Sequence, residues 1–229
     1  MGILAAHLND AAISVIDEGR ILYSEPGFAL LEGDHLATGN AAYSSARLKP
    51  RQIHNRYWSA LKSAPLADPR FQHMSPADLV SRQLEDIWKK VAKPGDRLAI
   101  AVPAYLDNEK LGLLLGIAME LDITVTAMVD AAVAATRRHY EHAGPVHIDL
   151  SLHVATMTRL MQEVQVQVER SAVIDDCGML TLFDSWLRII AEAFVQQSRF
   201  DPLHTAETEQ VLQDSILGWL SVAASADKV

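Results

Sequence analysis

The sequence predicts an α/β protein made of two successive units. Three short strand-like segments occur near the start of the chain and again at residues 146–173, and helical segments follow both triplets. Between the triplets, residues 97–141 alternate apolar runs of strand length with helical stretches. Such alternation is typical of parallel strands joined by helical crossovers. We therefore expect a first unit over residues 1–142 and a second unit over residues 143–229.

The first thirty residues have the pattern of a three-stranded antiparallel meander. The expected strands are rich in β-branched and aliphatic residues and read GILAAHL, AISVIDEG and RILYSEPG. Asn9-Asp10 and Glu18-Gly19 separate these strands and are typical turn residues. Residues 40–74 are polar and interrupted by prolines, which predicts an insertion of short helices and loops in the first unit.

A clear helix follows this insertion. Ser75 is a candidate N-cap, Pro76 suits the first helical position, and one apolar stripe follows, made of Leu79, Val80, Leu84, Ile87, Trp88 and Val91. Lys93-Pro94-Gly95 is expected to end the helix. Next come a strand at residues 97–105 that we expect to be buried on both faces, a helix at 108–120, a strand at 122–129 and a helix at 131–141.

The second unit repeats the meander. Its three strands are VHIDLSL, VATMTRLMQ and VQVQVERSAV, followed by an amphipathic helix at residues 180–197 and a last helix that Thr205 caps. The unit stops before a strand–helix–strand continuation of its own. Such a meander leaves a strand edge and an apolar sheet face uncovered. Either the last helix or self-association is expected to cover that face.

Composition excludes several classes of function. The chain has 229 residues, 49% of them hydrophobic, and a formal net charge of −9 without a basic run, so we expect no nucleic-acid partner and no membrane partner. No signal peptide or apolar segment of membrane-spanning length is visible, and a cytoplasmic location is the simplest expectation. The single cysteine, Cys177, excludes an internal disulfide and is expected to be a buried free thiol.

Several segments, taken in order, resemble a known family. The stretch from Ala101 to Ala135 contains V-P-A-Y at residues 102–105 and is similar to the V-P-A-Y-F, helix, strand, N-E-P-T-A-A-A stretch of heat-shock chaperones. Asp130 falls on the glutamate of that pattern. The segments SEPG and DCGMLTLFDSWLRIIAEAFVQQ also resemble parts of these chaperones. The chain thus resembles the actin-like ATPase superfamily, closest to the ATPase domain of DnaK-type heat-shock 70 chaperones. The resemblance implies a ribonuclease H-like fold with one complete unit and a partial second unit.

The two phosphate-binding loops of that family fall on altered residues here. The family's second loop, D-L-G-G-G-T, keeps Asp149 and Leu150, but its three glycines become Ser151, Leu152 and His153. In the first loop, D-L-G-T-T-N, the aspartate becomes His7, the glycine Asn9 and the first threonine Asp10. The resemblance implies that a nucleotide's phosphates would lie among six positions, namely His7, Asn9, Asp10, Asp130, Asp149 and Ser151.

These changes act against ATP. Glycines in such loops let backbone N–H groups approach phosphate closely, whereas Leu152 and His153 place side chains there. Asp10 adds a negative charge, and a like charge a few Å from a triphosphate costs about 1–4 kcal/mol. We therefore expect no catalytic residues and no cofactor, and a binding or scaffolding module with a protein partner or a homo-oligomer.

Two other interpretations stay open. In the first, the chain is an active ATP-binding, chaperone-like ATPase whose unusual loops hold ATP and Mg²⁺. In the second, His7 and His153 lie on facing turns near Asp149 and Asp130 and bind a transition metal in a metal-dependent enzyme. The alternative to a metal site is that both histidines are exposed turn residues or close an empty cleft by packing. Lys62 lies where the family holds a catalytic lysine, but its neighbours do not match.

Overall fold

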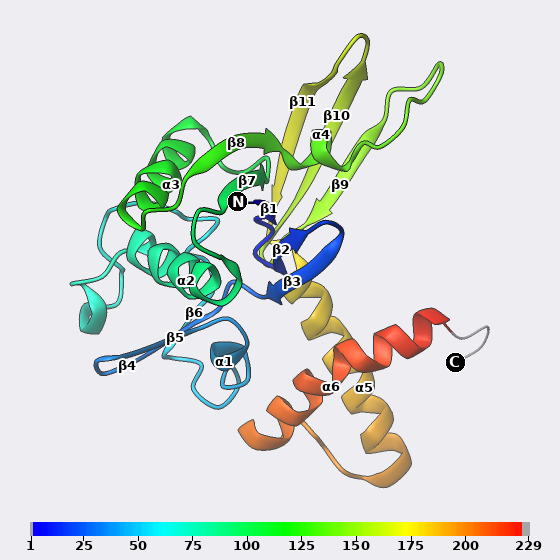
Figure 1. Cartoon of the computed structure of the whole chain (residues 1–229). Helices are drawn as coiled ribbons and strands as arrows, with labels where there is room; N and C mark the ends of the chain where they lie inside the picture. The colour runs from blue at the N-terminus through cyan, green and yellow to red at the C-terminus, as the bar shows by residue number, and fades with distance from the viewer. Residues whose placement is uncertain (1, 226–229) are drawn as a thin grey trace.

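The computed structural model describes residues 2–225 and has a mixed α/β fold (Figure 1). Its largest sheet has the strand order β3-β2-β1-β7-β8. The strands are β1 (Ile3–His7), β2 (Ile13–Asp17), β3 (Arg20–Glu25), β7 (Arg97–Val102) and β8 (Val125–Asp130). β1, β2 and β3 pair antiparallel, while β1 pairs parallel with β7 and β7 parallel with β8. The predicted meander and the predicted parallel strands are confirmed.

Two helices cover this sheet, α2 (Pro76–Val91) and α3 (Asn108–Glu120). α2 begins as predicted, because the Ser75 hydroxyl accepts a hydrogen bond from the Asp78 N–H at 3.3 Å and the Asp78 carboxylate accepts one from the Ser75 N–H at 2.7 Å. The apolar faces of both helices pack on the sheet in one core. On β7, the side chains that face this core are buried, whereas Ala99 and Ala101 between them are half-buried. The expectation that both faces of this strand are fully buried is therefore wrong.

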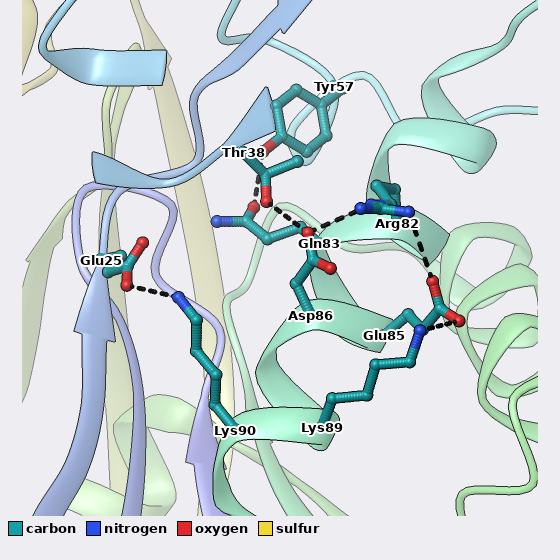
Figure 2. A network of polar contacts seen from close by, with 9 residues as sticks. All are labelled: Glu25, Thr38, Tyr57, Arg82, Gln83, Glu85, Asp86, Lys89 and Lys90. Carbon is teal, nitrogen blue, oxygen red and sulfur yellow. Dashed lines mark hydrogen bonds and ion pairs between the residues drawn. The ribbon is translucent and has the colours of Figure 1, made fainter. Parts of the chain in front are cut away.

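Polar contacts tie α2 to its surroundings (Figure 2). The buried Gln83 accepts hydrogen bonds from the Tyr57 hydroxyl at 2.5 Å and from the Trp58 indole N–H at 2.8 Å. Further along the helix, Lys90 forms an ion pair with Glu25 at the end of β3, at 3.0 Å. Because Gln83 satisfies two buried donors, the helix also fixes the segment around residues 57–58.

The segment between β3 and α2 contains a small sheet that the sequence reading missed. Its strands are β4 (Ala29–Glu32), β5 (His35–Thr38) and β6 (Ile53–His54), in the order β5-β4-β6. The β4–β5 hairpin turns at Gly33, whose φ of +60° suits glycine. The rest of the segment has the predicted short helices, α1 (Asn40–Tyr43) and a 3-10 turn at Pro69–Phe71.

The second meander is also confirmed. It consists of β9 (Val146–Leu150), β10 (Val154–Gln162) and β11 (Val166–Asp175), antiparallel in the order β11-β10-β9. The helix predicted at residues 131–141 is much shorter, because α4 (Ala131–Ala135) ends at Ala135. The residues after it form a loop, in which His139 and His142 are exposed. There the Gln162 side chain holds the backbone of residues 138 and 140 by hydrogen bonds of 2.9 Å.

The two last helices, α5 (Met179–Ser198) and α6 (Ala206–Ser225), match the predicted positions. Thr205 caps α6, since its hydroxyl accepts from the Thr208 N–H at 3.3 Å. Arg47, which follows α1, bonds to Asp184 of α5 and Gln213 of α6. In Figure 1 both helices lie at the bottom and the second meander extends to the top, so α6 does not cover the free part of that meander.

Two further predictions concern the burial of Cys177 and the absence of membrane-spanning helices. Cys177 is exposed, so the expectation of a buried thiol is wrong. It lies in the short turn between β11 and α5, where the chain runs over the surface. Within residues 2–225, no helix is both long and apolar enough to cross a membrane.

Candidate functional site

The two turns that the sequence resemblance aligns with phosphate loops meet in the structure. The first turn connects β1 to β2 and contains Asn9 and Asp10. The second connects β9 to β10 and contains Leu152 and His153. Both turns are tight: the Ala12 N–H donates to the Asn9 carbonyl at 2.9 Å, and the Ser151 N–H donates to the Val154 carbonyl at 2.9 Å.

Three hydrogen bonds join the turns directly, and we call them the turn contact. The Asn9 side-chain amide donates to the Asp149 carboxylate at 2.7 Å and to the Leu150 carbonyl at 3.0 Å. In the opposite direction, the Leu152 N–H donates to the Asp10 carboxylate at 2.7 Å. The Asn9 side chain is fixed in the orientation that lets its amide donate these bonds, because its own oxygen accepts a hydrogen bond from the Ala11 N–H at 2.9 Å. The turns are therefore bonded directly to each other, although one oxygen of Asp10 and one of Asp149 keep no hydrogen-bond partner.

Asp10 is the most unusual group in the turn contact. Its side chain is fully buried, and one carboxyl oxygen, Oδ2, has no protein partner. Burial raises the pKa of Asp10 from 3.8 to about 7, while the Leu152 N–H acts to lower it and the nearby Asp149 carboxylate to raise it further. A buried carboxyl with an unpaired oxygen is thus held partly protonated near neutral pH.

Leu152, in the second turn, is part of the core. Its side chain is 2% exposed and packs with Phe28, Leu30 and Ala42 of the first unit. Gly178, before α5, approaches the backbone of this turn so closely that a Cβ there would clash with the Leu152 carbonyl oxygen. No local sequence pattern indicates this packing role of Gly178.

His153 points away from the other predicted metal ligands. Its Nε2 atom lies 3.0 Å from the Asn55 side-chain oxygen, and burial lowers the pKa of His153 to about 4, with the charge of Arg56 acting in the same direction. His7 lies instead beside Asp149, with 4.0 Å between Nε2 and the carboxylate. Across residues 2–225, no group of three or more His, Cys, Asp or Glu side chains is arranged to hold a metal ion.

Two other predicted positions have structural roles. The Asp130 carboxylate accepts a hydrogen bond from the Ala132 N–H at 2.8 Å and so caps α4. Ser151 is 1% exposed, and its backbone closes the second turn. Lys62 lines a different cavity of about 350 Å³ beside His54 and Asn55. Of the six predicted phosphate-site residues, the structure therefore brings Asn9, Asp10 and Asp149 into the turn contact and places His7 beside it.

A cleft of about 490 Å³ lies next to the turn contact. It is lined by both turns, by β3, by α1 and by the helices α5 and α6, and among its walls are Asn9, Glu25, Tyr43, Leu152 and Phe183. The cleft therefore offers apolar contacts, the Glu25 carboxylate and the His7 imidazole, and none of its described lining residues is a lysine or arginine that could pair with a phosphate group.

Neither the known protein-family models nor the curated proteins contain a match to this chain.

Proposed function

We propose that this chain is a divergent member of the actin-like ATPase superfamily, with a ribonuclease H-like fold, that has lost ATP hydrolysis and acts as a binding or scaffolding module. Two features support the fold: a meander that continues into two parallel strands through helices, and a second meander after it. Fold alone does not imply activity, so the functional part of the proposal rests on the turns.

The observation that carries the proposal is the hydrogen bond from the Leu152 N–H to Asp10. In a phosphate-binding loop, backbone N–H groups of this turn would point at the anion. Here the anion acceptor is a carboxylate of the chain itself, supplied by the opposite turn. The Asp10 carboxyl group thus accepts the hydrogen bond that a phosphate oxygen would need. Because Asp10 is part of the chain, this acceptor cannot dissociate as a ligand does.

The electrostatics of the surrounding residues support the same conclusion. Asp10 and Asp149 lie in the turn contact, and no lysine or arginine lines the adjacent cleft. A triphosphate there would meet the Asp149 carboxylate, and the ionised fraction of Asp10, at a cost of about 1–4 kcal/mol for each close like-charge pair. To admit it, the turns would also have to break the three hydrogen bonds of the turn contact.

Unfolding in the presence of nucleotide tests this proposal. We expect the free energy of unfolding of the full chain to be the same with and without ATP–Mg²⁺ or ADP–Mg²⁺. An ATP-binding enzyme would instead be stabilised by about 2.7 kcal/mol at ligand a hundredfold above its dissociation constant. Asp10→Asn is the matched control, since it keeps an acceptor oxygen for Leu152 while removing the charge. Nucleotide stabilisation of the wild-type chain would contradict the proposal.

A further inference from the structure

The outer edge of β11 is a long strand edge without a partner. One side of β11 pairs with β10, and no strand of residues 2–225 pairs with its other side. Every residue of β11 after Val166 is exposed. A long exposed edge of this kind is a template on which another strand can pair.

Hydrogen-bond alternation identifies the free backbone groups. Pairs of hydrogen bonds alternate between the two sides of an antiparallel strand. The bonds from Ser151 to Val154 and from Leu160 to Pro145 show that the even-numbered residues of β10 bond to β9. Its odd-numbered residues therefore bond to β11, so Ser171 and Val173 of β11 direct their N–H and C=O groups outward.

A bulge changes this alternation in the middle of the strand. The register skips Glu169, because Arg159 faces Arg170 while the next residue, Leu160, faces Val168. Beyond the bulge, Val166 and Val168 are consequently the residues whose backbone groups point outward. The outward residues of β11 are thus 166, 168, 171, 173 and 175, and the first four lie symmetrically about a point between Glu169 and Arg170.

This symmetry makes the edge complementary to itself. When a second copy runs antiparallel along it, Val166 faces Val173 of the second copy and Val168 faces Ser171 of the second copy. Val168 and Val173 are 39% and 45% exposed, so both have apolar surface to bury. At the centre, Glu169 of each copy, which forms an ion pair with Arg159 of its own chain at 2.8 Å, also faces Arg170 of the other copy, so opposite charges come together.

We propose that two copies of this chain pair through the outer edges of β11 and so join their three-stranded sheets into one continuous sheet. The second copy is the occupant that matches this edge in hydrogen-bond register, side-chain type and charge. The contact along one strand is smaller than the about 1,200 Å² of a stable standard interface, so the dimer is reversible and depends on concentration. The pairing does not depend on the loss of ATP hydrolysis proposed above.

Sedimentation velocity of the full chain over a range of concentrations tests the pairing with two proline variants. Val168→Pro removes an outward N–H without removing a bond to β10, and we expect it to weaken the dimer by about tenfold or more. Ile148→Pro is the matched control, because it removes an outward N–H from β9 at the opposite edge of the same sheet, and it should leave the dimer unchanged. Circular dichroism verifies that each variant is folded.

Charge variants test the register itself and remain informative if a proline variant fails to fold. Glu169→Arg places two arginines opposite two arginines, and Arg170→Glu places four carboxylates together, so each variant alone should be monomeric. An equimolar mixture should form a mixed dimer, because the two charge sets are then complementary. A wild-type chain that stays monomeric at the highest concentration would overturn the proposal. So would a dimer that neither Val168→Pro nor the charge variants weaken.

Discussion

The two meanders of this protein share a pattern but differ in what supports them. The first continues into β7 and β8, and α2 and α3 bury its apolar face in the main core. The second has three strands, and its strand β11 is exposed along nearly all its length. The second meander is fixed by α4, which packs against all three of its strands, by the buried face of β10, and by its turn end, where Leu152 packs against Phe28 and the turn contact forms. The turn between β9 and β10 therefore joins the second meander to the first.

The largest effect expected from this comparison concerns Leu152. Leu152→Ala should lower the free energy of unfolding by about 2–5 kcal/mol, because a fully buried side chain at the junction of the units is removed. Met161→Ala is the control on the same meander, and since Met161 is 40% exposed, it should cost less than about 1 kcal/mol. Chemical denaturation measures both values. Equal losses would show that the turn does not anchor the second meander.

The next effect depends on pH and comes from Asp10. Its folded pKa of about 7 lies above the ordinary 3.8, so its contribution to stability is complete below pH 3.8 and is lost as the pH rises to 7. That loss is on the order of 4 kcal/mol at most. Asp10→Asn should therefore be increasingly more stable than the wild-type chain between pH 4 and pH 7.

Wild type must be compared with Asp10→Asn because His153 changes the free energy of unfolding with pH in the opposite direction. The pKa of His153 is lowered to about 4, so its contribution is lost as the pH falls from 6.5 to 4. The difference in unfolding free energy between wild type and Asp10→Asn removes this common contribution. A difference that stays constant from pH 4 to pH 8 would show that Asp10 is ionised in the folded state.

A smaller effect is expected at Gly178, where α5 meets the second turn. Gly178→Ala places a Cβ against the Leu152 backbone and should cost about 1–3 kcal/mol, because backbone must shift. Gly218→Ala within α6 is the matched control, since no atom lies near its new Cβ and alanine favours a helix by about 1 kcal/mol. The midpoint temperature of thermal unfolding should fall for Gly178→Ala and rise for Gly218→Ala. Shifts in the same direction would contradict the close approach at Gly178.

The smallest effect is the coupling between Asn9 and Asp149. A double-mutant cycle with Asn9→Ala and Asp149→Ala should give a coupling energy of about 1–2 kcal/mol, because their hydrogen bond of 2.7 Å involves a carboxylate. The pair Asn9 and Asp130 is the control, since Asp130 bonds within its own helix start. Additive losses at Asn9 and Asp149 would mean that the turn contact contributes nothing to stability.

The sequence predicted most regular elements, because local patterns determine them. The helix at residues 108–120 and the cap at Ser75 are correct to the residue. The β4–β5 hairpin was not predicted, although Leu31, Gly33 and Leu36 form a hairpin pattern. Its strands have only four residues each, so the alternation of apolar and polar residues is short. The helix predicted beyond Ala135 failed because the chain there is held by Gln162 of a later strand.

The sequence indicated the two turns but not the contacts between them. The resemblance aligned Asn9, Asp10 and Asp149 with phosphate loops, and the structure joins these residues by hydrogen bonds between the turns. The partners of these side chains lie about 140 positions away in the sequence, so no local pattern could pair them. The same holds for His153, whose partner Asn55 comes from the inserted segment that the sequence described only as loops and short helices.

Hydrogen exchange of the Leu152 amide tests the turn contact most directly. Because this N–H is buried and bonded to Asp10, we expect slow exchange in the free protein and the same rate with ADP–Mg²⁺ present. Asp10→Ala should accelerate the exchange, since the acceptor is lost. Fast exchange in the free protein that slows when ADP–Mg²⁺ is added would show instead that the amide is open to phosphate.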